Sequence, residues 1–311
     1  MRKEMHASTC LALVCALGCA APAAPGPEAA TAAPAASASV PSPSETADWW
    51  TAAKPCPDGT ELKGAAPPQG KEVWCEKAGA KHGPYTAFFA SGRKSEEKAY
   101  HEGKEQGRFT KWYESGQIAE EGRYDAGKLD GRNVTYHEGG QKKTQGEYRK
   151  GEKHAVWIGF APTGQKVQEA EFRVGKPQGM VRRWYDGGAK LDETEFRNGM
   201  KTGSYRAWYE NGQLKEQGLY VDGEKHGLWK TFREDGKQLE QAEYQGGKKN
   251  GKAARWFENG AHEWVGQYVD DKKDGTWTYY EEDEGKLVRT EVLKKGVVVS
   301  RKAEKTAPKK K

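Results

Sequence analysis

This 311-residue chain has little of the material from which globular cores are built. Hydrophobic residues make up 35% of it and charged residues 31%, the mean hydropathy is −0.99, and leucine, isoleucine and valine are scarce. Such a polar chain does not fill the interior of ordinary globular domains. The chain has 39 glycines, 11 tryptophans, 14 tyrosines and 8 phenylalanines. These counts argue against disorder of the chain as a whole, because disordered chains are poor in aromatic residues. The composition favours a repeat architecture, in which each unit buries a thin layer against its neighbours.

Long hydrophobic segments are also lacking. The apolar run at residues 10–19 is too short to cross a bilayer, which takes about 20 apolar residues. It follows the basic residues Arg2 and Lys3, a pattern typical of a secretory signal peptide. The run ends in Ala-Leu-Gly-Cys at Cys19, which resembles a bacterial lipobox, where the signal is cut before an acylated cysteine. We interpret residues 1–18 as a lipoprotein signal peptide and Cys19 as the lipidation site; an ordinary signal cleaved nearby is the alternative.

Residues 19–48 consist almost wholly of Ala, Pro, Ser, Thr, Gly and Glu. This composition does not bury a core, and its prolines keep the chain extended. We therefore expect a disordered tether between a lipid anchor and a folded body. The expected location is the cell envelope, lipid-anchored at the outer membrane or the periplasmic face, and a secreted protein is the alternative.

The chain has only five cysteines. Two leave with the signal peptide and Cys19 is the lipidation site, so Cys56 and Cys75 remain as an even pair in an exported chain. Such a pair predicts a disulfide, which would stabilise a small cap at residues 49–80 by roughly 3 kcal/mol. A cysteine-based metal site needs more ligands, and no second pair is present.

The net charge of +6 is a property of the two ends. Residues 301–311 carry six basic side chains against one acidic one, and residues 1–6 carry two against one, so residues 7–300 are neutral. A neutral body has no long-range field that attracts a polyanion, which excludes nucleic acid as the partner. Residues 298–311 are predicted to be a basic disordered tail; contact with anionic lipid or polysaccharide, at about 1 kcal/mol per charge, is the alternative.

A fixed 24-residue period organises the rest of the sequence. Eight glycines from Gly83 to Gly275 fall on one grid, and the single vacant grid point is Ala155. We number each unit from this glycine as position 0. Position 9 is glycine in eight units, position 17 is aromatic in eight, and position 5 is aromatic in all nine. The position-5 residues are Phe88, Trp112, Tyr136, Phe160, Trp184, Trp208, Phe232, Trp256 and Tyr280.

The unit that begins at Gly203 shows what one period forms. Residues 204–209 form a short segment rich in aromatic residues, as is typical of strands. The Asn-Gly pair that ends at Gly212 is a strong signal for a hairpin turn. Residues 213–221 make the return strand, in which Glu or Gln at positions 14 and 16 faces water and positions 15 and 17 face the other side. The predicted fold is an all-β, elongated antiparallel repeat sheet of about nine hairpins over residues 81–297. The sequence is compatible with a two-residue turn and with a three-residue turn that contains a glycine bulge. These two turns give strand registers that differ by one residue, so the register is not fixed by the sequence.

Units such as residues 225–237 resemble the MORN-repeat variant of many bacterial proteins. The resemblance covers roughly residues 81–297 and implies a repeat scaffold or a lipid- or protein-binding module. Taken with the export signal, it predicts a non-catalytic cell-envelope lipoprotein that acts as a scaffold or binding module. Some members are labelled antitoxins, so the alternative is an antitoxin- or immunity-like protein that sequesters a protein partner. A further alternative is an auxiliary domain that serves a separately encoded enzyme.

No catalytic, metal or cofactor site is predicted. His82, His154 and His226 occupy one turn position in every third unit, which separates them by on the order of 30 Å, too far to share a metal ion. The acidic residues 281–284 are interpreted as a solvated turn, because they lack the spacing of a calcium loop. Gly-x-Ser-x-Gly, P-loop, HExxH and paired-cysteine zinc motifs are missing from the sequence.

The aromatic residues remain as the candidate binding surface. Neighbouring rings at positions 5 and 6 are expected on opposite faces of the sheet, so at least one ring of each pair is a candidate for contact with a protein or an envelope polysaccharide. The alternative is that all the rings pack within the thin core of the hairpin sheet. The candidate residues are Trp112 and Tyr113, Trp184 and Tyr185, Trp208 and Tyr209, and Trp256 and Phe257.

Overall fold

The computed structural model describes residues 48–303. The predicted signal peptide, lipidation site Cys19 and nearly all of the predicted tether lie outside the described residues, as do residues 304–311. The description below concerns residues 48–303.

A short 3-10 helix and 23 strands make up the described part. They are η1 (Trp49–Thr51), β1 (Glu61–Ala65), β2 (Glu72–Lys77), β3 (Ala80–Phe88), β4 (Lys94–His101), β5 (Lys104–Glu105), β6 (Gly107–Trp112), β7 (Ile118–Asp125), β8 (Lys128–Leu129), β9 (Gly131–Tyr136), β10 (Lys142–Arg149), β11 (Glu152–Phe160), β12 (Lys166–Arg173), β13 (Lys176–Trp184), β14 (Lys190–Arg197), β15 (Met200–Trp208), β16 (Leu214–Val221), β17 (Glu224–Phe232), β18 (Gln238–Gln245), β19 (Lys248–Trp256), β20 (His262–Val269), β21 (Lys272–Tyr280), β22 (Leu287–Lys294) and β23 (Val297–Ala303).

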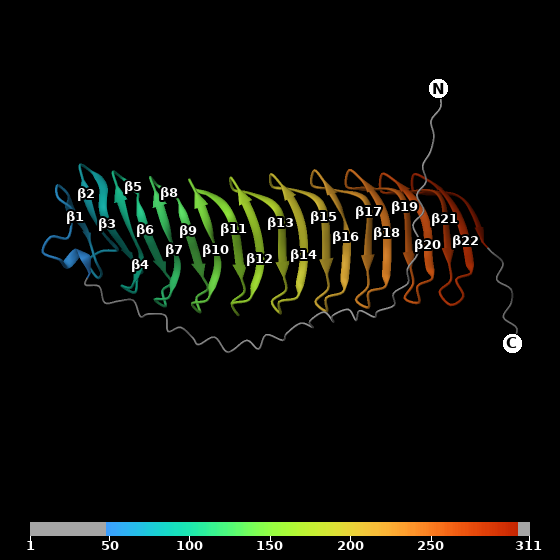
Figure 1. Cartoon of the computed structure of the whole chain (residues 1–311), viewed down its shortest axis with the longest axis horizontal. Helices are drawn as coiled ribbons and strands as arrows, with labels where there is room; N and C mark the ends of the chain where they lie inside the picture. The colour runs from blue at the N-terminus through green and yellow to red at the C-terminus, as the bar shows by residue number, and fades with distance from the viewer. Residues whose placement is uncertain (1–47, 304–311) are drawn as a thin grey trace, which may run out of the picture. The chain divides into compact units, whose positions relative to one another are not determined.

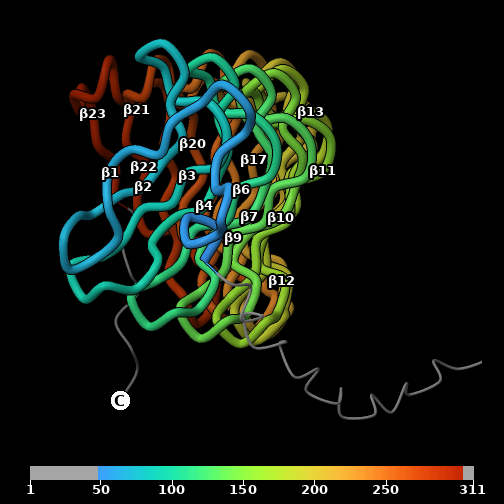
Figure 2. The backbone as a smooth tube through the Cα atoms, turned by 90° about the vertical axis from the view of Figure 1, so that its left-hand side faces the viewer, coloured from blue at the N-terminus to red at the C-terminus, as the bar shows by residue number. Residues whose placement is uncertain are grey.

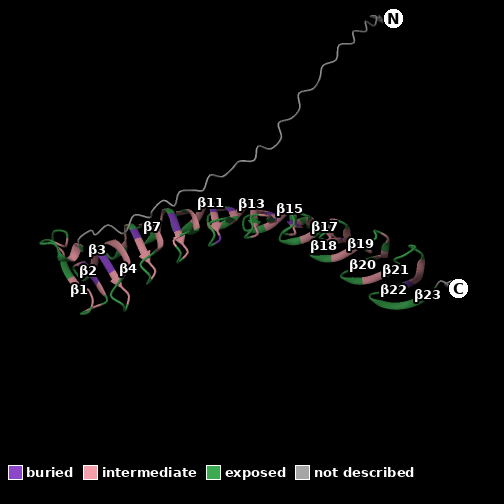
Figure 3. Ribbon diagram, turned by 90° about the horizontal axis from the view of Figure 1, so that it is seen from below, coloured by how far each residue is buried: buried purple, intermediate pink, exposed green. Residues whose placement is uncertain are grey.

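All strands belong to one antiparallel sheet of 23 strands, and they follow one another in chain order (Figure 1). Seen after a 90° turn, the successive hairpins lie one behind another (Figure 2). The nine predicted hairpins run from β3–β4 to β21–β22, with β1–β2 before them and β23 after them. Beyond the cap segment, no second layer covers the sheet within residues 48–303, and fully buried residues occupy only short stretches of it (Figure 3). The predicted fold class is confirmed.

The hairpin turn decides the register that the sequence leaves open. In the unit of Gly203, the Gly212 amide donates to the Tyr209 carbonyl (2.9 Å) and the Tyr209 amide donates to Gln213 (2.8 Å), which is the three-residue turn with a glycine bulge. Position 2 then pairs with position 15 and position 5 with position 11, across a bulge. Positions 2, 4, 13, 15 and 17 share one face of the sheet, here called face A. Positions 1, 3, 5, 11, 14 and 16 share the other, face B.

A second turn joins each unit to the next. Asp222 and Gly223 both have positive φ, 52° and 88°, as a type I′ turn requires. The Gly223 amide donates to the Lys201 carbonyl of the preceding linker turn (2.9 Å), and the same bond recurs along the array. His82 takes part in this stacking, since its Nδ1 accepts from the Glu102 amide at 3.3 Å. The turns are therefore bonded to one another along this edge of the sheet.

The core lies mainly on face A, where indole rings lie over glycines. Trp157, Trp229 and Trp277 at position 2 are 6%, 2% and 0% exposed. Each covers a glycine on the preceding strand, so that a methyl group added at Gly218 would overlap the Trp229 ring. The Trp229 indole nitrogen donates to the Leu219 carbonyl (3.1 Å). The rings thus cover backbone that water would otherwise reach.

Lysines cover the outer side of these rings. The Lys225 ammonium lies 3.9 Å from the Trp229 ring centre and pairs with the Glu216 carboxylate at 2.6 Å. Lys153 lies over Trp157 in the same way, at 4.2 Å, but Thr144 stands at the position of that carboxylate. Burial lowers the pKa of Lys153. Each such contact adds about 0.5–2 kcal/mol to a core that has no second layer.

Cys56 and Cys75 form the disulfide that the cysteine count predicts, with an S–S distance of 2.04 Å. Cys75 lies in β2, so the bond fixes the segment before β1 to the sheet. The Trp49 indole nitrogen donates to the Thr86 hydroxyl (2.9 Å), and the Trp50 ring packs edge-on against Phe88. The cap therefore consists of a hairpin that continues the array and a segment that covers part of face B.

The C-terminal end differs from the expected boundary. Residues 298–303, predicted as the start of a disordered tail, belong to β23. Three consecutive valines favour a strand, and Arg301 pairs with the buried carboxylate of Glu291 at 2.7 Å. Burial alone would raise the pKa of Glu291, but Arg301 and Arg289 outweigh it and lower the pKa. The basic composition of this segment does not indicate a strand, because the carboxylate that pairs with Arg301 lies ten residues earlier in the sequence.

Gly218→Ala tests the contact between ring and glycine. The added methyl group collides with Trp229, so we expect a loss of about 1–3 kcal/mol in unfolding free energy from overpacking. Gly187→Ala is the matched control, because its methyl group meets only the end of Glu210 at 3.6 Å. The double variant with Trp229→Val reproduces the chain's own facing pair Ala170 and Val181 and should lose less stability than the sum of the two single losses. Equal urea midpoints for Gly218→Ala and Gly187→Ala would contradict the assignment.

Ala155→Gly tests the vacant grid point. Ala155 has a φ of 55°, a left-handed conformation that strains any residue with a Cβ atom. We expect the glycine variant to be more stable by about 0.5–1 kcal/mol, and Gly227→Ala, where the added methyl group meets no atom within 4 Å, to lose a similar amount. Hydrogen exchange of β11 and β12 should slow in the first variant, because repeat arrays open locally. Faster exchange there would refute the explanation.

Candidate binding surface

Face B carries a ladder of alternating charges. The Glu169 carboxylate on β12 pairs with Lys166 at 2.9 Å and with Arg182 on β13 at 3.4 Å. The Lys166 ammonium also lies 4.4 Å from the centre of the Trp184 ring. The next unit repeats this arrangement with Lys190, Glu193, Arg206 and Trp208. We call this repeated set, from positions 11, 14, 3 and 5, the charge ladder.

The charge ladder breaks at β16. The two preceding units have Lys, Glu and Glu at positions 11, 14 and 16, whereas β16 has Leu214, Gln217 and Leu219. On β17, Lys230 occupies the position of the arginines and faces Gln217. Within residues 48–303, Lys230 has no ion pair. Leu219 and Leu228 are 49% and 45% exposed.

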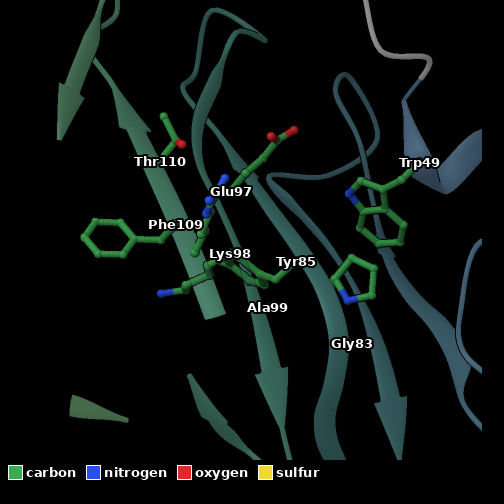
Figure 4. Close-up of a pocket in the computed structure, with 10 residues that line it drawn as sticks. Trp49, Gly83, Tyr85, Glu97, Lys98, Ala99, Phe109 and Thr110 are labelled. Carbon is green, nitrogen blue, oxygen red and sulfur yellow. The ribbon is translucent and has the colours of Figure 1, made fainter. Parts of the chain in front are cut away.

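The break coincides with a shallow hollow of about 260 Å³. Its side chains on face B are Ser204, Arg206, Gln217, Leu219, Leu228 and Lys230. A second hollow of about 400 Å³ uses the same repeat positions on β3, β4 and β6, beside the cap (Figure 4). There Trp49 forms one side and Thr110 the other, with Glu97 between them. The cap supplies an apolar wall at the hollow between β3 and β6, whereas Leu219 and Leu228 of the hollow at β16 and β17 face solvent.

All eight sequence-predicted contact residues are half-buried. Trp184 and Trp208 lie within the charge ladder on face B, and Trp256 packs on His262 at 5.2 Å between ring centres. Trp112 is the corresponding position-5 residue of its own unit.

The position-6 residues begin the hairpin turns at the same edge. Tyr113, Tyr185 and Tyr209 each donate a hydroxyl hydrogen bond to the position-5 carbonyl of the next unit, at 2.7, 3.0 and 2.9 Å. Phe257 is the fourth position-6 residue and has no hydroxyl group. These tyrosines thus connect neighbouring hairpins.

Sequence reasoning from the rings missed Leu219, Leu228 and Lys230. The signal that identifies them is a departure from the repeat at positions 14 and 16, which only a comparison of units at equivalent positions reveals. Within residues 48–303, no group of three or more His, Cys, Asp or Glu side chains is arranged to hold a metal ion. No helix in that part of the chain is long and apolar enough to cross a membrane.

Tyrosines within both faces make the fold sensitive to alkali. Burial, and then the nearby Glu216, raise the pKa of Tyr205 to about 12. Burial, and then a hydrogen bond to Glu121, raise the pKa of Tyr136 to about 12. The folded chain therefore holds these protons more tightly than the unfolded chain, whose tyrosines ionise near pH 10. The stability that they contribute is complete below about pH 10 and is lost as the pH rises towards about 12.

We expect the urea midpoint to decrease as the pH rises from about 10 to about 12. The tyrosinate absorbance that belongs to Tyr136 and Tyr205 should rise together with the loss of strand circular dichroism. Tyr136→Phe and Tyr205→Phe should each flatten this pH dependence, since phenylalanine does not ionise. Ionisation of Tyr136 or Tyr205 near pH 10 in a chain that stays folded, measured as the absorbance difference between the wild type and the corresponding phenylalanine variant, would refute the prediction.

Two stretches of the array, residues 105–126 and 201–222, match the family model of the MORN repeat variant. No curated protein matches the chain. Among solved structures, the TcdB2–TccC3–Cdc42 complex is 10% identical over 78% of this chain and 17% of that chain, with a TM-score of 0.18. The Photorhabdus luminescens Tc holotoxin pore carrying a TccC3 mutation is 12% identical over 78% and 17%, also with a TM-score of 0.18. Alternansucrase in complex with isomaltononaose is 13% identical over 74% and 18%, with a TM-score of 0.14. The chain spans less than a fifth of these three proteins. The repeat unit is what this chain shares with a known family.

Proposed function

We propose that this protein is a non-catalytic binding scaffold of the cell envelope, held at a membrane by a lipid on Cys19. The match to the MORN repeat variant supports a repeat scaffold. The observation that carries the binding role is the pair of solvent-exposed leucines, Leu219 and Leu228, at the break in the charge ladder. Exposed apolar residues gathered in a hollow are typical of contact surfaces. The basic and apolar start of the chain with its lipobox-like end supports the anchor.

A single-layer sheet suits this role. Its rings are largely engaged within the array, in contacts with glycines, lysines and carbonyl groups. The surface left for a partner is therefore the broad side of the strands on face B. A tether of about 30 residues with many prolines would hold that surface away from the membrane.

Metabolic labelling with a fatty-acid analogue tests the anchor. We expect label on the wild type, none on Cys19→Ser, and unchanged label on Cys10→Ser and Cys15→Ser, because only the cysteine after the cleavage point is acylated in lipoproteins. The two control cysteines lie in the same segment. An unlabelled wild type, or label that survives Cys19→Ser, would rule out the anchor.

Capture from solubilised envelope fractions tests the scaffold. The full-length protein should retain a protein that a chain unfolded by disulfide reduction and urea does not retain. Trp184→Ala and Trp208→Ala report whether the ring row contributes, provided that circular dichroism shows a folded sheet. If the folded wild type retains nothing from envelope fractions, the scaffold proposal is wrong.

A further inference from the structure

We infer that the break in the charge ladder at β16 and β17 docks a partner polypeptide that presents a carboxylate beside an apolar side chain. The inference rests on the proposed scaffold role and adds the chemistry of the partner. Three observations carry it: a cation that lacks its counterion, two exposed leucines beside it, and a rigid backbone beneath them.

The cation is Lys230. In the two preceding rungs of the charge ladder, Arg182 and Arg206 each reach a glutamate at position 14 of the strand before. Lys230 stands at the same position, but its neighbour is the neutral amide of Gln217. Lys230 has no ion pair within the described part of the chain. A carboxylate from outside would take the place of the missing glutamate.

The apolar part is Leu219 with Leu228. Position 16 is Glu171 and Glu195 in the two preceding units, so Leu219 replaces a charge on an open sheet face. Leu228 on β17 lines the same hollow. A side chain of a partner that covers both leucines would remove them from water, at about 25 cal/mol per Å² of apolar area.

Face A holds this part of the backbone in place. The Trp229 indole donates to the carbonyl of Leu219, and its ring stacks on Tyr205 and packs edge-on against Tyr220. Trp229 is 2% exposed. The site is thus built on a rigid element, so that little ordering opposes binding.

The same hollow does not suit a polysaccharide. A sugar ring stacks on an open aromatic face, and the ring among the lining residues, Tyr205, belongs to face A, where it contacts Tyr220 and Trp229. The cations at the rim are Arg206, which pairs with Glu193, and Lys230, which has no ion pair within the described residues. The open charge of Lys230 favours an acidic partner. A polypeptide with an aspartate or glutamate next to a leucine, phenylalanine or similar residue supplies both features.

Two variants remove the site by restoring the repeat. Gln217→Glu gives Lys230 an internal counterion, and Leu219→Glu restores the residue of the two preceding units. Because the array already accommodates glutamate at these positions, both variants should fold. The matched controls are Gln241→Glu, which makes the first change one unit later, and Val156→Glu, which replaces an apolar residue of face B that is equally exposed, at 49%.

The probe is a phage-displayed library of random dodecapeptides, selected on the immobilised full-length protein. We expect enriched peptides to carry Asp or Glu adjacent to an aliphatic or aromatic residue. In fluorescence anisotropy, Leu219→Glu should abolish binding of these peptides. Gln217→Glu and Lys230→Gln should each weaken it by about two- to fivefold at low salt, as for a surface ion pair. Both control variants should bind as the wild type does.

Three results would overturn the site: no enrichment over an empty surface, enriched peptides without acidic residues, or equal binding by Leu219→Glu. The capture experiment separates this failure from failure of the scaffold role. If Leu219→Glu retains the same envelope component as the wild type, the scaffold stands and the site is wrong. If the wild type retains no component, the scaffold itself is wrong.

Discussion

The absence of a second layer over most of the described sheet is the constraint on which the other features depend. A strand in such a sheet has only its two neighbours to pack against, so each unit builds its core within the thickness of one side chain. The indole of Trp229 does this by lying flat between the backbone of Gly218 and the ammonium of Lys225. Glycine lets the ring approach, and the lysine covers the outer side of the ring with an ammonium group that Glu216 neutralises. Few aliphatic residues are needed in such a core, which explains the low hydropathy of the chain.

The same constraint explains the fixed period. If one unit gained or lost a residue within a strand, its ring would move to the other face and lose its glycine. The two turns prevent this slip, because the three-residue turn sets the bulge at position 9 and the type I′ turn aligns the next unit. Ala155 shows how strongly the array imposes its geometry, since the backbone keeps a φ of 55° there without the glycine that favours it.

The period, the Asn-Gly turns and the cysteine count were enough to predict the hairpin array and the disulfide from sequence. The register was not predictable, because Asn-Gly fits both turn types, and only the hydrogen bonds of Gly212 show which is formed. The strand β23 was not predicted because the residue that pairs with Arg301 is Glu291, ten residues earlier. Nothing in the basic segment itself reveals this counterion. The aromatic rings were predicted as contact residues, whereas the hydroxyl groups of residues such as Tyr209 donate hydrogen bonds to the next hairpin. Leu219 is recognised as part of the hollow only because it differs from the glutamates at position 16 of the two preceding units.

Lys153 and Lys230 both lack the carboxylate that the repeat supplies at the equivalent position of other units, and the two faces treat this loss differently. On face A, Lys153 lies over the ring of Trp157, and burial lowers its pKa, so the fold absorbs the missing charge. On face B, Lys230 borders an open hollow, and no ring or carboxylate within the described residues covers its charge. The same departure from the repeat is therefore a matter of internal packing on one face and of surface chemistry on the other. In an array of repeated units, the omission of a counterion leaves a charge open at the surface, while the neighbouring units keep the backbone in place.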